Sequence, residues 1–352
     1  MSIIDKSPDK AYPAAWYPLC RATDLKPGSV LPVELGGVRY ALWRSASGQI
    51  SAVEATCCHV GADLARGTVV GEALQCPLHH WRYGTDGVCV HIPGAATIPP
   101  RARQTALTCV DSYGLVLGFL GGAPTYAPPR FVDEAEPIWS EAAVVDVAAP
   151  LATLVANSYD GQHFAAVHDR DLLEPPQITR ANKHHIAIHY RAKVVGQRLN
   201  DRIMRGLGID HVGITIHCWG GSVLHVYNER TANTILVALL PVDEQHTRVF
   251  ILTALKAKAR GVMRLFQPLQ LWIARWLAVA FLRPDMSVLE GVTMRPRVLL
   301  PGADDCLVAW LRYWRALPRA DQAQADEATT SRSVPTLTLP DSLVAGLTPI
   351  DA

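Results

Sequence analysis

The pattern of apolar and polar residues divides the chain into two unlike halves. From about residue 28 to 120, short runs rich in β-branched and aromatic residues alternate with Gly-Gly, Ser-Gly and Asp-Gly pairs. Such runs are typical of strands that are joined by turns. The clearest are GVRYALWR (37–44), ISAVEA (50–55) and YGLVLGFL (113–120). This half is predicted to form a small all-β domain.

The second half begins with a helical pattern, LATLVANSYDGQHFAAVH (151–168). Longer apolar runs follow, spaced for an antiparallel meander, which needs only short connections; they cover 185–195, 212–219, 222–228, 234–242 and 247–255. A strongly apolar helix is expected over 262–283, and another helix over 304–317. A long antiparallel sheet with covering helices makes the whole chain α+β.

A length of 352 residues exceeds the usual size of a single core, so two domains are expected. The proline-rich stretch 123–131 is the predicted crossing between them. We therefore expect an N-terminal domain over 1–125 and a second domain over 126–317. The segment 318–352, rich in Ala, Thr, Ser, Asp and Pro, has little to bury and is predicted to be disordered.

Composition excludes some classes of partner. A formal net charge of +1 gives no basic excess for binding phosphates, so no nucleic-acid partner is expected. The first twenty residues lack the unbroken apolar core of a signal peptide, which favours a cytoplasmic location. Charged and polar residues interrupt the apolar helix over 262–283, so any membrane contact is expected to be peripheral.

The strongest chemical signal is a pair of short motifs. Cys57-Cys58-His59 is followed by Cys76-Pro77-Leu78-His79, each at a turn of the predicted β domain. Two thiolates and two imidazoles suit either Zn²⁺ or a [2Fe–2S] cluster with His on one iron. Two loops at the tip of a β domain favour the cluster, because a zinc finger normally uses a knuckle and a helix.

Four further cysteines stand without a partner at ligand spacing and are interpreted as buried thiols: Cys20, Cys109, Cys218 and Cys306.

A second constellation lies in the first helical pattern, which reads Asn157-x-x-Asp160-x-x-His163-x-x-x-x-His168. Asp160 and His163 share a face of an ideal helix, whereas His163 and His168 diverge by about 140°. For both imidazoles to reach one ion, the helix is expected to break or distort between them. Two imidazoles and one carboxylate form the facial triad of non-haem Fe(II) oxygenases.

The segments CCHVGADLARGTVVG (57–71) and LQCPLHHWRYGTDGVCVHIPG (74–94), followed by SYDGQH (158–163), resemble the Rieske non-haem iron oxygenases. The resemblance implies that Cys57 and Cys76 bind one iron of a [2Fe–2S] cluster, and that His59 and His79 bind the other. His80 departs from the family, in which many members have glycine at this place.

The same resemblance implies that His163 and His168 bind a mononuclear Fe(II). It assigns Asn157 and Asp160 to catalysis, with Asp160 linking this iron to the cluster of a neighbouring subunit. An acidic third ligand is expected far downstream, on a helix after the last strands. Asp285 fits that place best; its competitors are Glu290, Asp304 and Asp305.

The function implied is oxidation of a hydrophobic small molecule with O₂. No dinucleotide fingerprint is present, so electrons from NAD(P)H are expected through a separate ferredoxin or reductase. A ring of subunits, a homotrimer, is implied by the role of Asp160. Arylamine N-oxygenation to a nitro compound is favoured narrowly over C–H hydroxylation or desaturation of a sterol-like polycycle. A non-catalytic Rieske electron carrier and a zinc-binding module are the alternatives of other classes.

Overall fold

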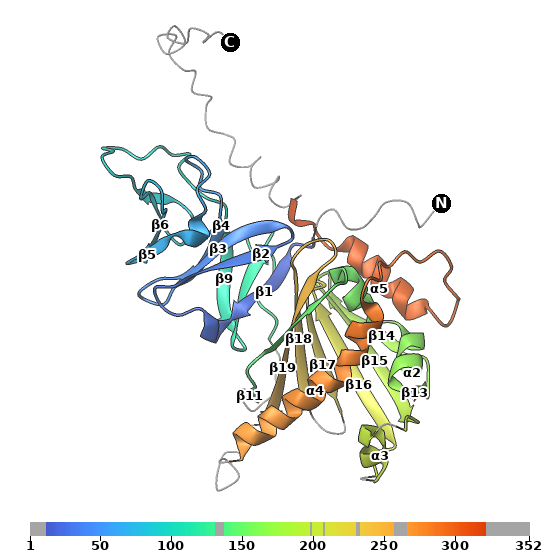
Figure 1. The fold of residues 1–352 in the computed structure, drawn as a ribbon. Coiled ribbons are helices and arrows are strands. Elements are labelled where there is room, and N and C mark those ends of the chain that lie inside the picture. The colour runs from blue at the N-terminus through green and yellow to red at the C-terminus, as the bar shows by residue number, and fades with distance from the viewer. Residues whose placement is uncertain are drawn as a thin grey trace.

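The structure is a computed structural model that describes residues 12–130, 137–197, 199–206, 208–229, 233–256 and 266–321. Figure 1 shows two domains, with the N-terminal strands beside the edge of a large second sheet that helices cover. This confirms the predicted α+β class, with a small all-β domain followed by a larger domain built on a long antiparallel sheet.

The N-terminal domain contains two antiparallel sheets. The larger has the order β1-β10-β9-β4-β3-β2 and is formed by β1 (Ala15–Arg21), β2 (Val30–Leu35), β3 (Val38–Arg44), β4 (Ile50–Glu54), β9 (Ala106–Ser112) and β10 (Leu115–Leu120). The smaller is formed by β5 (Thr68–Val70), β6 (Ala73–Gln75), β7 (Arg82–Tyr83) and β8 (Cys89–His91). Short 3₁₀ turns lie at Ala22–Asp24 and Leu64–Arg66.

The second domain is built on a nine-stranded antiparallel sheet. Its main path runs β11-β19-β18-β17-β16-β15-β13, while β12 pairs with β19 and β14 with β15. The strands are β11 (Pro137–Trp139), β12 (Ala143–Val147), β13 (Arg170–Leu172), β14 (Gln177–Asn182), β15 (His185–Val194), β16 (His211–Trp219), β17 (Val223–Asn228), β18 (Asn233–Pro241) and β19 (Thr247–Lys256). The helices are α1 (Leu151–Asn157), α2 (Gly161–His168), α3 (Leu199–Gly206), α4 (Gln267–Leu289) and α5 (Asp305–Ala316).

Alternation along the long strands decides which side chains face the helices. On β15, Ile186, Ile188 and Tyr190 are buried, and Tyr190 reaches the cavity beneath α4. Because successive side chains of a strand point to opposite faces, His185 and His189 of β15 project from the other face. The predicted meander is therefore present, with one apolar face turned towards the helices.

The two domains pack directly on each other. Trp16 of β1 accepts a hydrogen bond at its carbonyl from the Ser222 hydroxyl, at 2.6 Å, and donates from its indole to the carbonyl of Tyr126 in the crossing segment, at 2.9 Å. Ala14 donates its backbone N–H to Pro318, so the described start of the predicted tail lies against the first strand. Residues 322–352 lie outside the described residues, and their disorder stays a prediction.

Two helices differ from their predicted bounds. The pattern over 151–168 forms two helices, α1 and α2, separated by residues 158–160. The apolar helix is described from Gln267, and it continues to Leu289 with Pro284 inside it. Proline removes one backbone donor but leaves the following turn free to continue, so Asp285 lies on α4 rather than after it. Of the helices that the structure describes, none is both long and apolar enough to cross a bilayer.

Candidate active site

The four predicted cluster residues lie in two tight loops at one end of the N-terminal domain. In the first loop, Gly61 donates its N–H to the Cys57 carbonyl at 2.8 Å. In the second, the N–H of Cys76 donates to the Trp81 carbonyl at 2.8 Å. Each loop is thus closed by its own backbone hydrogen bonds, and the loops are held next to each other by the small sheet.

Burial separates the two kinds of ligand. Cys57 and Cys76 are 3% and 1% exposed, whereas His59 and His79 are exposed at the surface. The two imidazole rings lie edge to face with centroids 4.7 Å apart, and His59 stacks on Trp81. Buried thiols below two adjacent exposed imidazoles fit a [2Fe–2S] cluster whose outer iron is held by histidine.

Tyr83 supports the inner side of this site. Its hydroxyl lies 3.0 Å from Sγ of Cys57 and 3.4 Å from Sγ of the adjacent Cys58. Burial raises the pKa of the Cys57 thiol, while the Tyr83 hydroxyl acts in the opposite direction. The sequence placed Tyr83 near the motif but gave no sign that its hydroxyl reaches the sulfur.

The backbone explains the departure at His80. Its φ angle is +59°, in the left-handed region that favours glycine. A glycine at this place would adopt the turn without steric cost. His80 is exposed, so its side chain lies at the surface while the backbone makes the turn.

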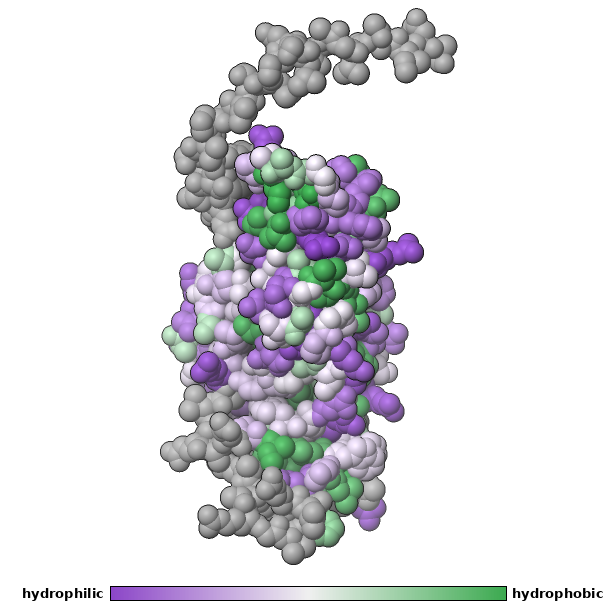
Figure 2. All heavy atoms as spheres, turned by 90° about the vertical axis from the view of Figure 1, so that its left-hand side faces the viewer, coloured by the Kyte–Doolittle hydropathy of each residue, from purple (hydrophilic) through white to green (hydrophobic). Residues whose placement is uncertain are grey.

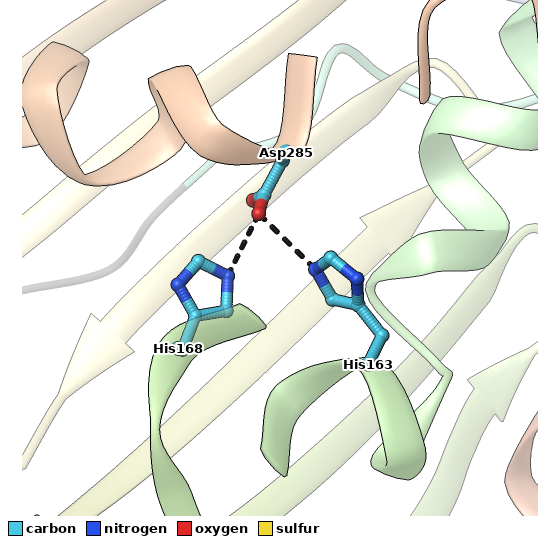
Figure 3. A group of neighbouring side chains, drawn as sticks. All are labelled: His163, His168 and Asp285. Atoms are coloured by element: carbon cyan, nitrogen blue, oxygen red, sulfur yellow. Dashed lines mark hydrogen bonds and ion pairs between the residues drawn. The ribbon is translucent and has the colours of Figure 1, made fainter. Parts of the chain in front are cut away.

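The second predicted site brings together three residues that are far apart in sequence. Nε2 of His163 and Nε2 of His168 lie 3.1 Å and 2.8 Å from Oδ1 of Asp285. Figure 3 shows the two imidazoles pointing at the Asp285 carboxylate, which approaches from α4. Their ligand atoms lie within 4.8 Å of one another, and no other group of three or more such residues in the described part of the chain is this close. The donor set and its convergence fit a mononuclear metal ion.

The expected break between His163 and His168 is wrong. Both histidines lie on α2, which ends at His168, and the interruption comes earlier, at residues 158–160. Asp160 caps α2, its Oδ1 accepting the N–H groups of Gln162 and His163 at 2.9 Å and 3.1 Å. The cap starts a new helix at Gly161. The two imidazoles meet at one end of this helix without a break between them, with ring centroids 5.3 Å apart.

Asn157, the last residue of α1, and Asp160, the N-cap of α2, border the triad. Nδ2 of Asn157 lies 3.0 Å from Nε2 of His163. The capping bonds of Asp160 both use Oδ1. Both side chains line the same cavity as the triad.

The competitors of Asp285 lie elsewhere. Asp304 accepts hydrogen bonds from the Gln162 amide at 2.8 Å and from the Leu300 N–H at 2.7 Å. Asp305 accepts from the Gly302 N–H, and Glu290 is exposed just after α4. Only Asp285 among these carboxylates contacts both histidines.

Two opposing effects set the ionisation of Asp285. Burial raises the pKa of its carboxyl, but the hydrogen bonds with His163 and His168 outweigh burial, so the pKa lies below its usual range. The carboxylate is therefore ionised at neutral pH, as a metal ligand must be.

Neighbouring side chains hold the second histidine in place. Phe281 of α4 stacks on the His168 ring with centroids 4.4 Å apart. Arg170 donates to the His168 carbonyl at 2.8 Å and forms an ion pair with Asp201, also at 2.8 Å. Both charged side chains are nearly fully buried, at 7% and 5% exposure, so this pair fixes the end of α2 to α3.

The triad lies at the polar end of an apolar cavity. Apart from Asn157, Ser158, Asp160 and the triad itself, the lining consists of aliphatic, aromatic and methionine side chains from α1, α2, α4 and strands β15 to β19. The Tyr190 hydroxyl is turned to the Ser158 carbonyl at 3.0 Å, so it does not face a ligand as a free donor. A molecule in this cavity would be held by apolar contact and oriented towards the triad.

Comparison with known proteins shows which proteins the chain is similar to. Residues 15–111 match the Rieske [2Fe-2S] domain. Apo dicamba monooxygenase has the same fold, with a TM-score of 0.65 at 19% identity, covering 91% of this chain and 99% of that one. The structure of Pseudomonas putida CBB5 NdmA with caffeine aligns with a TM-score of 0.62 at 20% identity, over 86% and 94% of the two chains.

Curated relatives match over a shorter length. Aminopyrrolnitrin oxygenase of Pseudomonas fluorescens is 35% identical over 183 residues, 47% of this chain and 50% of its own length. The oxygenase component of 3-ketosteroid-9-alpha-monooxygenase of Rhodococcus rhodochrous is 30% identical, over 47% and 44%. Cholesterol 7-desaturase of Bombyx mori is 31% identical, over 46% and 37%. The chain thus spans half or less of the length of these relatives, and the resemblance to Rieske oxygenases is confirmed.

Proposed function

We propose that this chain is the oxygenase component of a Rieske-type system, taking electrons from a separate ferredoxin or NAD(P)H-dependent reductase to oxidise a hydrophobic small molecule with O₂. One observation carries the proposal: His163, His168 and Asp285 converge at the polar end of an apolar cavity. Two imidazoles and one carboxylate on one side of an ion leave its other positions open for O₂ and substrate.

The ligand assignment follows the geometry. His163, His168 and Asp285 would hold Fe(II), while Cys57, Cys76, His59 and His79 would hold the [2Fe–2S] cluster. When bound, the Fe(II) would supply the activation of O₂, and the protein supplies binding and orientation. A homotrimer is part of this proposal, because the family resemblance gives Asp160 the role of linking this iron to the cluster of a neighbouring subunit; the two capping bonds of Asp160 use Oδ1 alone.

The chain's own residues perform three tasks in this scheme. The apolar walls exclude water, and burial of apolar surface against them binds the hydrophobic substrate. Phe281 and the Arg170–Asp201 pair keep the His168 ring and backbone in place. The ionised Asp285 carries a negative charge that balances a bound cation in a site that is otherwise apolar.

Arylamine N-oxygenation to a nitro compound is the first specific candidate. It is supported by the 35% identity to aminopyrrolnitrin oxygenase, the matched region of which covers about half of each chain. C–H hydroxylation or desaturation of a sterol-like polycycle is the second candidate. It is supported by the two steroid-oxidising relatives and by the breadth of the apolar lining.

A single-turnover experiment separates these candidates. The iron-loaded, chemically reduced protein is mixed with O₂ and a panel of arylamines and sterol-like polycycles, and the products are identified by mass spectrometry. A hydroxylamine formed in the single turnover, followed by a nitro compound when reductant and O₂ are supplied again, supports N-oxygenation. A hydroxylated or desaturated polycycle with unchanged amines supports the second candidate.

The matched control is Asp285→Asn, which keeps the shape of the site but removes the charged ligand. We expect it to give no product from either class of compound while its cluster is still reoxidised slowly. Cluster reoxidation without any oxidised compound in the native protein would contradict the oxygenase proposal and favour an electron carrier.

A further inference from the structure

The N-terminal half of α4 exposes large apolar side chains that have no part in the cavity. Trp272 and Trp276 are 56% and 59% exposed, and Leu269 is 53% exposed. Phe266, just before the helix, and Ile273 and Leu277 within it are also exposed. We call these six residues the α4 outer face. In Figure 2 apolar residues gather at the lower end of the molecule, where Figure 1 places the start of α4.

Helical geometry shows that this is a single surface. With 100° between successive residues, the six positions fall within an arc of about 140°. The buried Leu271 and Ala278, and the cavity-lining Leu282, fall on the opposite side of the same helix. One face of α4 therefore closes the cavity while the other presents a continuous apolar strip to solvent. Exposed strips of this kind mark surfaces that bind another phase or molecule.

The charged residues in the stretch of α4 that carries this strip have one sign. Between residues 266 and 284 the sequence contains two arginines, Arg275 and Arg283, and no Asp or Glu. On α4 itself Arg283 is exposed, and Arg275 donates to the backbone carbonyl of Glu141. Tryptophan, leucine and isoleucine on one side of a helix, with arginines as the charged residues of the same stretch, are typical of helices that lie in the interface of anionic bilayers.

We propose that the α4 outer face binds the surface of an anionic lipid bilayer, with the helix lying in the interface plane. The helix does not span the bilayer, since none of the described helices is suited to do so. The indole rings sit at the level of the headgroups, and the arginines contact lipid phosphates.

A second copy that binds through this same face is the less suitable occupant. An isologous contact through this face would place Arg283 of one copy near the cations of the other, because such a contact pairs the same patch with itself. A bilayer meets both the apolar strip and the positive charge with a complementary surface. The proposal is independent of the oxygenase reaction, but it gives hydrophobic substrates a short path from the bilayer to the cavity behind α4.

Vesicle sedimentation of the full-length protein tests the proposal. We expect binding to vesicles of phosphatidylcholine with phosphatidylglycerol, weakening as salt rises, and at least about tenfold weaker binding to phosphatidylcholine alone. In the variant Trp272→Glu/Trp276→Glu, affinity for the anionic vesicles should fall by at least about tenfold, because two interfacial anchors are replaced by anions.

The matched control is Val38→Glu/Val298→Glu, which adds the same charge at two exposed apolar residues outside α4. It should bind as the native protein does. Sedimentation velocity of all three proteins reports the oligomeric state, and circular dichroism reports the fold. The proposal is overturned if the native protein does not bind anionic vesicles, or if it binds neutral vesicles equally well. It is also overturned if the tryptophan variant binds like the control, or if that variant changes the oligomer mass while no protein binds vesicles.

Discussion

The two candidate metal sites of this chain are built in opposite ways. The cluster site takes its four ligands from two loops within 23 residues of sequence, and each loop is closed by its own backbone hydrogen bonds. The triad takes two ligands from α2 and the third from α4, 122 residues away from His163. The first site depends on local turns, whereas the second exists only when α4 is packed on the sheet. This difference predicts how each site fails when it is disturbed.

The largest expected effect is loss of the mononuclear site in Asp285→Asn. Product formation should fall by at least about 10²-fold, the upper end of the roughly 10–100-fold loss that removal of an outer partner of a metal ligand causes. Iron analysis should show less iron per chain, while the visible spectrum of the cluster is unchanged. Glu290→Gln removes a nearby exposed carboxylate and should behave as the native protein does. Equal loss in both variants would contradict the assignment of Asp285.

The reciprocal change is Cys76→Ser in the local site. Removing one thiolate should abolish the cluster and its visible absorption, because both sulfur ligands hold the same iron. The triad should still bind Fe(II), measured by retention of about one iron per chain after reconstitution. If the iron of the triad is lost as well, the two sites are not independently built.

The same difference explains what the sequence could predict. The cluster motif, the strands β15 to β19 and the pair His163 and His168 follow from spacing and alternation, which are local properties. The placement of Asp285 needed the family resemblance, since nothing in its neighbourhood separates it from Glu290. The structure separates them by packing: Asp285 faces α2, and Glu290 is exposed.

Other features could not be predicted from neighbouring residues, because they depend on contacts that form only in the folded chain. The break at residues 158–160 depends on the cap that Asp160 forms on α2, whereas residues 151–168 were interpreted as one helical pattern. The Arg170–Asp201 pair joins residues from two elements, one of which, α3, the alternation did not predict. The hydroxyl of Tyr83 reaches sulfur only because β7 packs beneath the first loop.

A third variant, Arg170→Leu, tests the buried ion pair that supports the triad. It leaves Asp201 buried without its partner, so the free energy of unfolding should fall by about 3–5 kcal/mol. Denaturant unfolding measures this loss. Arg248→Leu is the control, because its ion pair with Asp146 is exposed and should contribute less than about 1 kcal/mol. Similar losses in both variants would contradict the structural role of the buried pair.

A smaller effect is expected for Tyr83→Phe in the cluster site. Loss of one hydrogen bond to sulfur, about 1 kcal/mol, should lower the reduction potential by about 40 mV for a one-electron couple. Protein-film voltammetry measures the shift. An unchanged potential would show that the hydroxyl does not contact the cluster ligand in the assembled site.

The effect of acid concerns imidazoles on the sheet face opposite the cavity. Burial, with a contribution from His217, lowers the pKa of His185 and of His225 to about 4. As the pH falls, both histidines become protonated near pH 6.5 in the unfolded chain, before they do so in the folded chain. The free energy of unfolding is therefore highest above pH 6.5 and falls as the pH drops towards 4. In the double variant His185→Gln/His225→Gln, the free energy of unfolding measured in urea should fall less steeply between pH 6.5 and 4. An equally steep loss would assign the acid sensitivity to other groups.

Iron and acid-labile sulfide, measured on the full-length reconstituted protein, test the central claim most directly. The account predicts about three irons for every two sulfides, because a [2Fe–2S] cluster and one mononuclear iron occupy the same chain. Equal iron and sulfide would contradict the second site and indicate an electron carrier. Zinc without sulfide would contradict both sites.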